Sequence, residues 1–393
     1  MLKIGLLTGE FPPMQGGVGA FTQALAVALA ELGQEIYIIS HREARPTDRS
    51  YKARELREPI DLGYAKLLAR GRKWDGKDNQ MIASMVERYE LDILNIQYQP
   101  AAFNMRRPAI NLLPWRLRGL THSVVTFHDL RTPFLFPKAG RLRRRVVDFM
   151  AEKAEGVIVT NQQDYLKLAQ KRVEHLQKIP IGSNIAVHDV SAETRAHTRQ
   201  SLDLAPTDVL LAYFGFLNTS KGADTLIAAL AQLPANFHLL FVGGQTGASD
   251  SSNNQSFLDQ IKTQVATAGL NQRVHWTGFV QDEQVSAFLK SAEMIVLPYH
   301  DGVSLRRGTL MAALAHGCPI ITTPPRMAEV GLDDQYFVLV PPADSVKLAE
   351  AIVALARDEE KRQALGLGSA EFSQQFQWSK IAAQTIQFYQ SLL

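Results

Sequence analysis

Residues 2–39 read LKIGLLTGEFPPMQGGVGAFTQALAVALAELGQEIYII and contain a strand, a loop, a helix and a second strand. The apolar run 2–7 has the length of a buried strand, and a loop rich in proline and glycine follows it. An Ala- and Leu-rich helix is expected over 18–32, because Gly33 supplies a C-terminal cap and the β-branched run 35–39 is typical of a strand. Such a unit predicts parallel strands joined by a right-handed crossover.

The same alternation continues along the chain and then restarts. A polar interruption falls at 186–208, after which a strand at 209–214, a glycine-containing loop and a helix at 222–233 repeat the opening pattern. Further strands are expected at 92–97, 123–127, 156–160, 237–242, 273–276, 294–297, 320–323 and 337–340, and an exposed loop at 245–255. We therefore expect an α/β fold with two Rossmann-like, doubly wound domains that face a central cleft, where such folds bind ligands.

Composition excludes several classes of protein. With 393 residues, 46% apolar and 21% charged, the chain is long enough for two hydrophobic cores and too apolar to be mainly disordered. The single cysteine, Cys318, permits neither an internal disulfide nor a thiolate metal cluster. There is no run of about 18 apolar residues and no export signal, so a cytoplasmic location is expected, with attachment to the inner membrane surface left open.

Charge is distributed unevenly. Residues 1–200 hold 30 Lys and Arg against 21 Asp and Glu, a net charge of +9, whereas residues 201–393 hold 12 against 18, a net charge of −6. The basic residues at 106–107, 116, 118, 138, 141 and 143–145 are interleaved with apolar and aromatic ones. This pattern suits contact with an anionic membrane, although a solvated helix face has the same composition. Nucleic acid is not expected as a partner, because the other half is acidic and carries no recognition motif.

Three loops at the expected strand ends have the composition of anion sites. In the first, Gly16 and Gly17 precede a helix whose N-terminal amides favour an anion, but the spacing is not the dinucleotide fingerprint and a plain turn would look the same. The second places Asn218 and Lys221 before a helix, which suits a diphosphate as well as a solvated turn. The third holds Asp301, Ser304, Arg306, Arg307, Gly308 and Thr309. Together the loops predict a phosphorylated ligand.

His128 is the candidate catalytic side chain of the first half. It follows the expected strand 123–127 and would face the ligand-binding edge of the sheet, although a lone histidine is often structural. None of the ten histidines lies at metal-ligand spacing from another histidine or from Cys318. The sequence therefore predicts no metal site.

In their order and spacing, these motifs resemble the retaining glycosyltransferases with two Rossmann-like domains, the GT-B superfamily, and within it family 4, which includes the phosphatidylinositol mannosyltransferases and sucrose synthases. The likeness covers nearly the whole chain. Its elements are the Pro-Pro and Gly-Gly loop after the first strand, His128, IPIG at 179–182, the loop 215–222 with Lys221, and AHGCPIITT at 315–323. The resemblance implies an acceptor-binding domain over residues 1–190, a nucleotide-sugar donor domain over 205–375, and a helix over 376–393 that returns to the first domain.

Two departures from the family pattern fall in the implied donor site. The family usually has an arginine after the glycine of the second loop, where this chain has Phe216. It also tends to have two glutamates, one near the sugar and one on the ribose, at the positions that Ser304 and Ala312 occupy here. Our interpretation is that Arg306 and Arg307 replace the missing arginine on the diphosphate. In the same interpretation, Asp301 or Ser304 takes over a hydroxyl contact.

The resemblance implies transfer of a sugar from a nucleoside diphosphate sugar to a glycan, lipid-linked or small-molecule acceptor, with retention at the anomeric carbon and without a metal or other cofactor. Lys221 and Arg306 would stabilise the departing diphosphate, and His128 would bond to a sugar hydroxyl or to the acceptor. Two other classes stay open. One is a catalytically silent relative that binds a nucleotide sugar as a sensor or assembly partner, and the other is a nicotinamide-dependent oxidoreductase, which the missing fingerprint disfavours.

Overall fold

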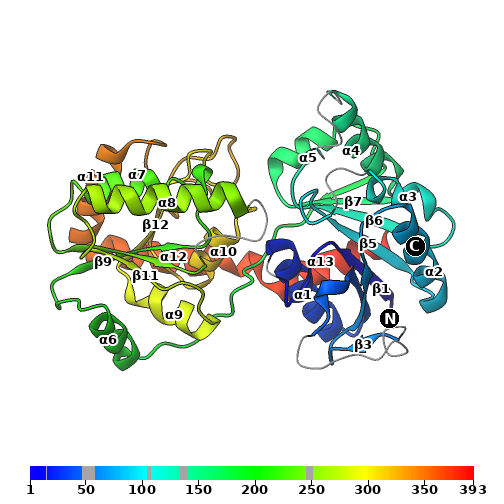
Figure 1. Cartoon of the computed structure of the whole chain (residues 1–393), viewed down its shortest axis with the longest axis horizontal. Coiled ribbons are helices and arrows are strands. Elements are labelled where there is room, and N and C mark those ends of the chain that lie inside the picture. Colours follow the sequence, from blue (N-terminus) through cyan, green and yellow to red (C-terminus); the bar gives the residue numbers. More distant parts are fainter. Residues whose placement is uncertain (15, 47–57, 104–107, 131, 133–139, 245–250) are drawn as a thin grey trace. The chain divides into compact units, whose positions relative to one another are not determined.

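The chain forms two compact α/β units (Figure 1). The structure is a computed structural model that describes residues 1–14, 16–46, 58–103, 108–130, 132, 140–244 and 251–393. The first unit comprises Met1–Gly182 together with Gln377–Leu393, and the second comprises Ser183–Phe376.

The first unit is built on an eight-stranded sheet in the order β3-β4-β2-β1-β5-β6-β7-β8. Its strands are β1 (Lys3–Thr8), β2 (Glu35–His41), β3 (Ile60–Asp61), β4 (Lys66–Gly71), β5 (Ile93–Tyr98), β6 (His122–Phe127), β7 (Gly156–Val159) and β8 (His175–Lys178). All neighbouring strands are parallel except β3 and β4. The carboxyl ends of β4, β2, β1 and β5 therefore lie side by side along one edge of the sheet.

Helices cover both faces of this sheet, which is why its strands are apolar on both sides. The helices are α1 (Gly17–Glu31), α2 (Gly76–Tyr89), α3 (Leu113–Arg116), α4 (Leu142–Lys153), α5 (Gln162–Leu168) and α13 (Trp378–Gln390). Successive strand residues point to opposite faces, so Ile4 and Leu6 of β1 pack with α1 and α13, while Leu7 packs with the cluster formed by α2 to α5. The sheet therefore separates two apolar cores.

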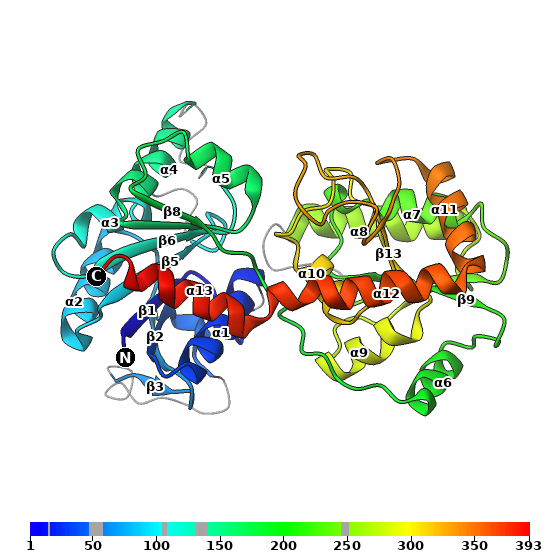
Figure 2. The same ribbon diagram turned by 180° about the vertical axis from the view of Figure 1, so that it is seen from behind.

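The C-terminal helix α13 belongs to the first unit and packs against α1 (Figure 2). Near its end, the buried hydroxyl of Tyr389 accepts a hydrogen bond of 2.6 Å from Asn95 Nδ2, and Thr126 Oγ1 donates to Asn95 Oδ1 at 2.9 Å. A buried polar chain thus links α13 to β5 and β6. The expected return of the last helix to the first domain is confirmed.

The second unit is built on a six-stranded parallel sheet in the order β11-β10-β9-β12-β13-β14. Its strands are β9 (Val209–Phe214), β10 (Phe237–Val242), β11 (Val274–Trp276), β12 (Met294–Leu297), β13 (Ile320–Thr322) and β14 (Val338–Leu339). Its helices are α6 (Ala192–Ser201), α7 (Ala223–Leu230), α8 (Ser251–Thr267), α9 (Asp282–Ser291), α10 (Gly308–Ala315), α11 (Ser345–Arg357) and α12 (Glu359–Ser373). The chain leaves β9 and returns to it at β12, which puts a topological switch point between these two strands.

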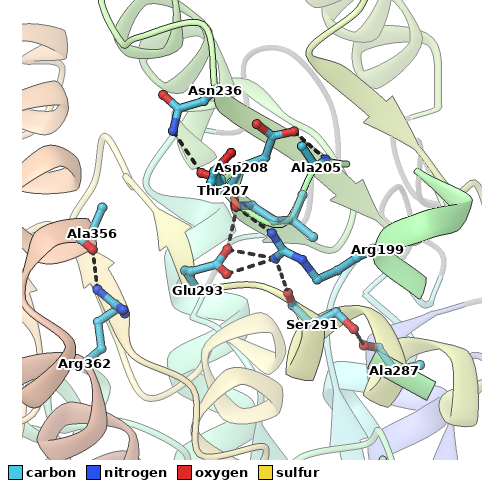
Figure 3. Close-up of polar contacts among 11 residues, drawn as sticks. Arg199, Ala205, Thr207, Asp208, Asn236, Ala287, Ser291, Glu293, Ala356 and Arg362 are labelled. Carbon is cyan, nitrogen blue, oxygen red and sulfur yellow. Dashed lines mark hydrogen bonds and ion pairs between the residues drawn. The ribbon is translucent and has the colours of Figure 1, made fainter. Parts of the chain in front are cut away.

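The polar stretch 186–208 contains α6, which packs on α9. Figure 3 shows how Arg199 of α6 reaches Glu293, the residue before β12, at 2.9 Å, and also donates to the carbonyl oxygens of Ser291 and Asp208. Glu293 in turn accepts from the backbone N–H of Leu210 at 2.6 Å. These bonds anchor α6 at the amino ends of β9 and β12, on the opposite edge from the loops considered below.

The predicted α/β fold with two Rossmann-like parallel sheets is confirmed. The strands β3, β4 and β8 were not predicted, because KLLARG and HLQK mix charged and apolar residues without a clear period. The expected loop at 245–255 is wrong for 251–255, which form the first turns of α8. Buried apolar side chains begin only at Phe257, so the polar composition of those first turns hid the helix. Residues 106, 107, 138 and 245–250 lie outside the described residues.

Candidate active site

The first glycine loop, between β1 and α1, already holds a carboxylate. Oε1 of Glu10 accepts hydrogen bonds from the backbone N–H groups of Val18 at 3.1 Å and Gly19 at 3.4 Å, in the first turn of α1. A Cβ atom at Gly16 would lie 2.0 Å from Glu10 Oε1, so a side chain there would displace this carboxylate. Gly17 is exposed, and a Cβ atom there would meet nothing within 4 Å. The glycine loop thus presents helix N-terminal amides, but an internal anion uses two of them.

Glu10 is half-buried, and its environment affects its charge. Burial raises the pKa of the Glu10 carboxyl, while the hydrogen bonds from Gly19 and Val18 oppose that effect. Desolvation therefore outweighs the stabilisation from the helix amides. The role predicted for Gly16 and Gly17 in donor binding stays a prediction, and Glu10 is the competitor that any phosphate at this helix would meet.

His128 lies directly after β6, at the carboxyl edge of the first sheet, as the sequence predicted. Its Nε2 is 2.9 Å from Oε1 of the buried Gln97, and its ring makes an edge-to-face contact with Phe21, with ring centroids 4.6 Å apart. Burial lowers the pKa of His128 to about 3, so the imidazole is neutral at physiological pH. If Nε2 donates to Gln97, Nδ1 is left as a hydrogen-bond acceptor.

In the second unit, the loop after β9 and the segment after β12 are in contact. Gly215 has φ of +103°, and a side chain there would collide with the methyl group of Thr309. Gly222 has φ of +73°, and a side chain there would collide with the carbonyl oxygen of Pro298. Both positions therefore require glycine for conformation and for space. The two loops that the sequence singled out thus form one cluster at the switch point between β9 and β12.

Lys221 is the central cation of this cluster. Its Nζ donates a 2.6 Å hydrogen bond to the carbonyl oxygen of Phe216, and the side chain of Asn218 accepts from the Ser220 N–H at 3.1 Å, which shapes the 3₁₀ turn Thr219–Lys221. Burial and the positive charge of Arg307 lower the pKa of Lys221 to about 8. Two cationic side chains from different loops therefore lie close enough to repel each other, and an anion between them would relieve that repulsion.

Arg307 is held by two contacts. Its guanidinium forms a short ion pair with Asp301 and lies 4.0 Å from the ring centroid of the buried Tyr299, whose hydroxyl is 2.6 Å from Thr309 Oγ1. Arg307 Nε and the hydroxyl of the fully buried Tyr213 have no hydrogen-bond partner among the described residues. Two buried donors without acceptors point to a polar ligand or an ordered water in this cluster.

The remaining predicted donor residues differ in how they are placed. Arg306 is half-buried, and its side chain has no hydrogen bond or ion pair to any other described residue. Ser304 Oγ accepts weakly from the Arg306 N–H at 3.5 Å. Ala312 is fully buried within α10, and Gly308 begins that helix. Neither position of the missing glutamate pair therefore offers a carboxylate.

The structure thus brings Lys221, Arg307, Asp301 and Thr309 together, with Asn218 and Arg306 in the same two loops. His128, Gly16 and Gly17 belong to the first unit. Sequence reasoning missed three contributors, Glu10, Gln97 and Tyr299. Glu10 could have been noticed, because Thr8-Gly9-Glu10 and Phe214-Gly215-Phe216 occupy corresponding positions at the end of the first strand of each half. Nothing local indicated Gln97 or Tyr299.

Among the residues that the structure describes, no group of three or more His, Cys, Asp or Glu side chains is arranged to hold a metal ion. Among the same residues, the helices are too short or too polar to cross a bilayer.

Comparisons with known proteins place both halves of the chain in one functional class. Residues 16–181 match the family model described as glycosyl transferase 4-like domain, and residues 208–358 match the one described as glycosyl transferases group 1. A phosphatidyl-myo-inositol mannosyltransferase of Mycobacterium leprae is 24% identical over 403 residues, which cover 100% of this chain and 97% of that protein. A D-inositol 3-phosphate glycosyltransferase of Xylanimonas cellulosilytica is 26% identical over 58% of this chain and only 54% of that protein.

The fold also matches a solved structure over its whole length. The Anabaena protein Alr3699/HepE, crystallised with UDP and glucose, superimposes with a TM-score of 0.75 at 18% identity, covering 100% of both chains. At this identity the likeness concerns the fold.

Proposed function

Because this chain belongs to the family-4-like glycosyltransferases of the GT-B superfamily, we propose that it transfers a sugar from a nucleoside diphosphate sugar to an acceptor with retention at the anomeric carbon and without a metal. Glycosyltransferase activity follows from the family. The retaining course, the donor class and the metal independence are the proposal. The cluster of Lys221 and Arg307 in the second unit supports a diphosphate leaving group stabilised by cationic side chains, whereas retention rests on the family resemblance.

Cations at this position suit the chemistry of the leaving group. Departure of a nucleoside diphosphate leaves negative charge on its phosphate oxygens, and preorganised positive groups stabilise that charge in the transition state. Lys221 offers an ammonium group beside Thr309 and Arg307, at the switch point where parallel α/β sheets bind ligands. The buried donors Arg307 Nε and Tyr213 Oη add two hydrogen-bonding positions without acceptors. The UDP bound in the Anabaena structure supports a nucleoside diphosphate as the ligand class.

Arg306, and not Arg307, is the arginine that replaces the family's usual one at Phe216. Its side chain has no partner among the described residues, whereas Asp301 and Tyr299 already hold Arg307. Arg307 then contributes its buried Nε donor, which has no partner among the described residues, and lowers the pKa of Lys221. We expect Arg306→Ala to weaken nucleoside diphosphate binding without changing its pH dependence. Arg307→Ala is expected to shift that pH dependence upward, and equal effects of the two variants on both quantities would contradict this division.

His128 takes a hydrogen-bonding role in this proposal. A pKa of about 3 keeps the imidazole neutral, so it does not act as a cationic acid at physiological pH. With Nε2 directed to Gln97, Nδ1 can accept a hydrogen bond from a sugar or acceptor hydroxyl. No carboxylate nucleophile is assigned. In the preferred course, the acceptor attacks the anomeric carbon on the same face of the sugar from which the diphosphate departs.

The alternative is a catalytically silent relative that binds nucleotide sugars. It is favoured by one specific observation, that Ser304 and the buried Ala312 leave the two glutamate positions without carboxylates. Each lost hydrogen bond to a sugar or ribose hydroxyl would weaken donor orientation by about 0.5–1.5 kcal/mol, and more for a charged acceptor. Such a protein would bind a nucleoside diphosphate yet release no product with any donor.

The two proposals separate in one set of measurements. Thermal unfolding with saturating UDP, GDP, ADP and NAD identifies the ligand class, since a ligand at a hundred times its Kd adds about 2.7 kcal/mol of stability. The matching nucleoside diphosphate sugars are then followed for slow hydrolysis or for transfer to a panel of sugar, polyol and lipid acceptors. A shift with a nucleoside diphosphate and turnover supports the transferase, and a shift without turnover supports the silent relative. A shift with NAD alone would contradict both.

Contact with an anionic membrane is a further part of the proposal. The neighbouring helices α3 and α4 expose Trp115 and Leu142, which are 51% and 46% accessible, and exposed arginines lie close to them in the sequence. These arginines are Arg116, Arg118, Arg141, Arg144 and Arg145. The combination suits anionic headgroups with shallow apolar insertion. Sedimentation with vesicles that contain phosphatidylglycerol should decrease as salt increases, and equal binding to purely zwitterionic vesicles would contradict the electrostatic part.

A further inference from the structure

The first unit buries a row of polar side chains between its sheet and the helices α1 and α13. Ile93 of β5 and Val124 of β6 belong to the apolar core on this side of the sheet. Side chains two and four residues further along each strand point to the same face. These are Asn95, Gln97, Thr126 and His128. The first three are at most 2% exposed, and His128 is half-buried at the end of the row.

Hydrogen bonds join the two strands along this row. Oδ1 of Asn95 accepts from Oγ1 of Thr126 at 2.9 Å. Two residues further on, Oε1 of Gln97 lies 2.9 Å from Nε2 of His128. The backbone N–H of His128 also donates to the carbonyl oxygen of Tyr98 at 3.1 Å. The pairing of β5 with β6 therefore extends to His128 and fixes its main chain.

Gln97 is a poor choice of residue for stability alone. It is fully buried, and its Nε2 has no hydrogen-bond partner among the described residues. A buried donor without an acceptor destabilises a fold, and an apolar side chain of similar size would fill the same space without that cost. What the glutamine adds is Oε1, which can only accept and so selects the histidine tautomer with its proton on Nε2.

Two aromatic rings restrain the plane of the imidazole. The buried ring of Phe21 in α1 meets the ring of His128 edge to face, with centroids 4.6 Å apart and an interplanar angle of 77°. Phe21 in turn meets Trp378, the first residue of α13, at 5.2 Å and 66°. Edge-to-face contacts are a favoured geometry for aromatic pairs. An aromatic column therefore runs from the C-terminal helix through α1 to His128.

The other end of α13 reaches the same polar row. The hydroxyl of Tyr389 accepts from Nδ2 of Asn95 at 2.6 Å, and α13 packs along α1 between these two contacts (Figure 2). The helix thus supports the row through Trp378 near its start and through Tyr389 near its end. The segment that ends the chain is built into the surroundings of His128.

We propose that Gln97, Phe21 and Trp378 are positioning residues for glycosyl transfer. Gln97 selects the tautomer of His128, and the aromatic column holds the ring, so that Nδ1 stays available as the hydrogen-bond acceptor. The inference rests on the proposed function, in which Nδ1 accepts from a sugar or acceptor hydroxyl. It assigns to the returning helix a part in the chemistry of the first unit.

Nuclear magnetic resonance of protein labelled with ¹⁵N-histidine reads the tautomer directly. Two-bond ¹H–¹⁵N correlations distinguish a proton on Nε2 from a proton on Nδ1, and the signal that disappears in His128→Asn belongs to His128. We expect the neutral form with its proton on Nε2 in the wild type at pH 7. A proton on Nδ1, or an averaged mixture of the two forms, would overturn the role of Gln97.

Variants of the three positions connect the tautomer to turnover. Gln97→Met removes the acceptor, so His128 should become a mixture of tautomers. Trp378→Leu removes the outer ring of the column and should broaden the His128 signal, while Trp378→Phe keeps a ring and should restore it. In Gln97→Met and Trp378→Leu, kcat should decrease about tenfold to a hundredfold, with KM for the donor within about twofold of wild type. An altered tautomer with unchanged kcat would contradict the role in transfer.

Phe388→Leu is the matched control. Phe388 is a buried aromatic residue of the same helix, but it packs near Gly156 at the start of β7 and lies outside the aromatic column. This variant should lower the unfolding temperature without changing the His128 signal. Equal changes of that signal in Phe388→Leu and Trp378→Leu would mean a general loosening of α13 and would overturn the role of Trp378.

The spectra also separate this inference from the proposed function. They require no turnover, so they report on His128 whether or not the wild type transfers a sugar. A wild type that turns over no donor would reject glycosyl transfer, and the same variants would still decide whether these side chains position His128.

Discussion

The loops after β1 and β9 begin alike and end with opposite charges at their helices. Thr8-Gly9-Glu10 and Phe214-Gly215-Phe216 each place a glycine directly after the strand, and each loop leads into a helix near the carboxyl edge of its sheet. In the first loop, the Glu10 carboxylate takes two amides at the N-terminus of α1. In the second, an aromatic ring stands at the matching position, and Lys221 precedes α7.

This difference shows that glycine content alone does not identify a phosphate site. Both loops offer helix N-terminal amides, but a carboxylate at one of them repels a phosphate while an ammonium at the other attracts it. We therefore expect the second unit to supply most of the affinity for the diphosphate.

Lys221→Ala should produce the largest loss. A hydrogen bond between charged groups contributes about 1.5–3 kcal/mol, so the affinity for the nucleoside diphosphate should decrease roughly tenfold to a hundredfold. Calorimetry measures this directly. Lys347→Ala is the control in the same unit, because Lys347 is exposed and pairs only with Glu350 among the described residues. If both variants bind alike, the second loop is not the diphosphate site.

The affinity of the second loop should also depend on pH. Lys221 titrates near pH 8 in the free protein, and a bound diphosphate favours its charged form, so the pKa rises on binding. Affinity should therefore be highest below pH 8 and decrease by up to tenfold per unit as the pH rises above it. Titrations between pH 7.5 and 9.5 measure this slope, which should vanish in Lys221→Ala. An unchanged slope in that variant would assign the titration to another group.

The order of strands and helices could be predicted because apolar period and glycine punctuation are local signals. Lys221 could also be selected as a candidate from the sequence, because it lies in a short polar loop between a strand and a helix. The pairing of Asp301 with Arg307 could not be predicted, because both belong to one irregular loop in which no periodicity fixes side-chain direction. Composition suggested Arg307 as a donor-site residue, which stays a prediction, but it did not indicate that the guanidinium lies on Tyr299.

Glu10 could be noticed as the second residue after β1, but its capping of α1 could not be predicted, for a similar reason. The carboxylate reaches forward eight residues to Val18, across a turn whose path depends on how α1 packs on the sheet. Residues such as Gln97 and Tyr389 became relevant only through the parallel register of β5 with β6 and the return of α13. Local patterns therefore identified the loops, and tertiary packing decided which charges meet in them.

Glu10→Ala should affect stability more than ligand binding. Loss of a side-chain cap costs about 0.5–2 kcal/mol, so the free energy of unfolding of the first unit should decrease by about 1 kcal/mol. Urea unfolding measures this, with Glu43→Ala as a control at an exposed carboxylate of the same unit. Nucleoside diphosphate affinity should stay within about twofold of wild type. A large gain in affinity would instead mean that Glu10 excludes the phosphate from α1.

Phe216→Arg should have the smallest effect, because two opposing changes follow from the new charge. The arginine would attract a diphosphate, yet it would stand beside the carbonyl that Lys221 contacts and lower the pKa of that lysine further. The ring of Phe216 lies against Gly244, so closely that a Cβ atom on Gly244 would be 2.9 Å from it. The longer arginine side chain at position 216 must therefore turn away from Gly244. We expect a gain in nucleoside diphosphate affinity of less than tenfold at pH 7, declining toward pH 9. Phe216→Leu, which adds no charge, should bind like wild type. A loss of affinity in Phe216→Leu would show that the aromatic ring itself contacts the nucleotide, and a loss in Phe216→Arg alone would mean that the added charge acts mainly by lowering the pKa of Lys221.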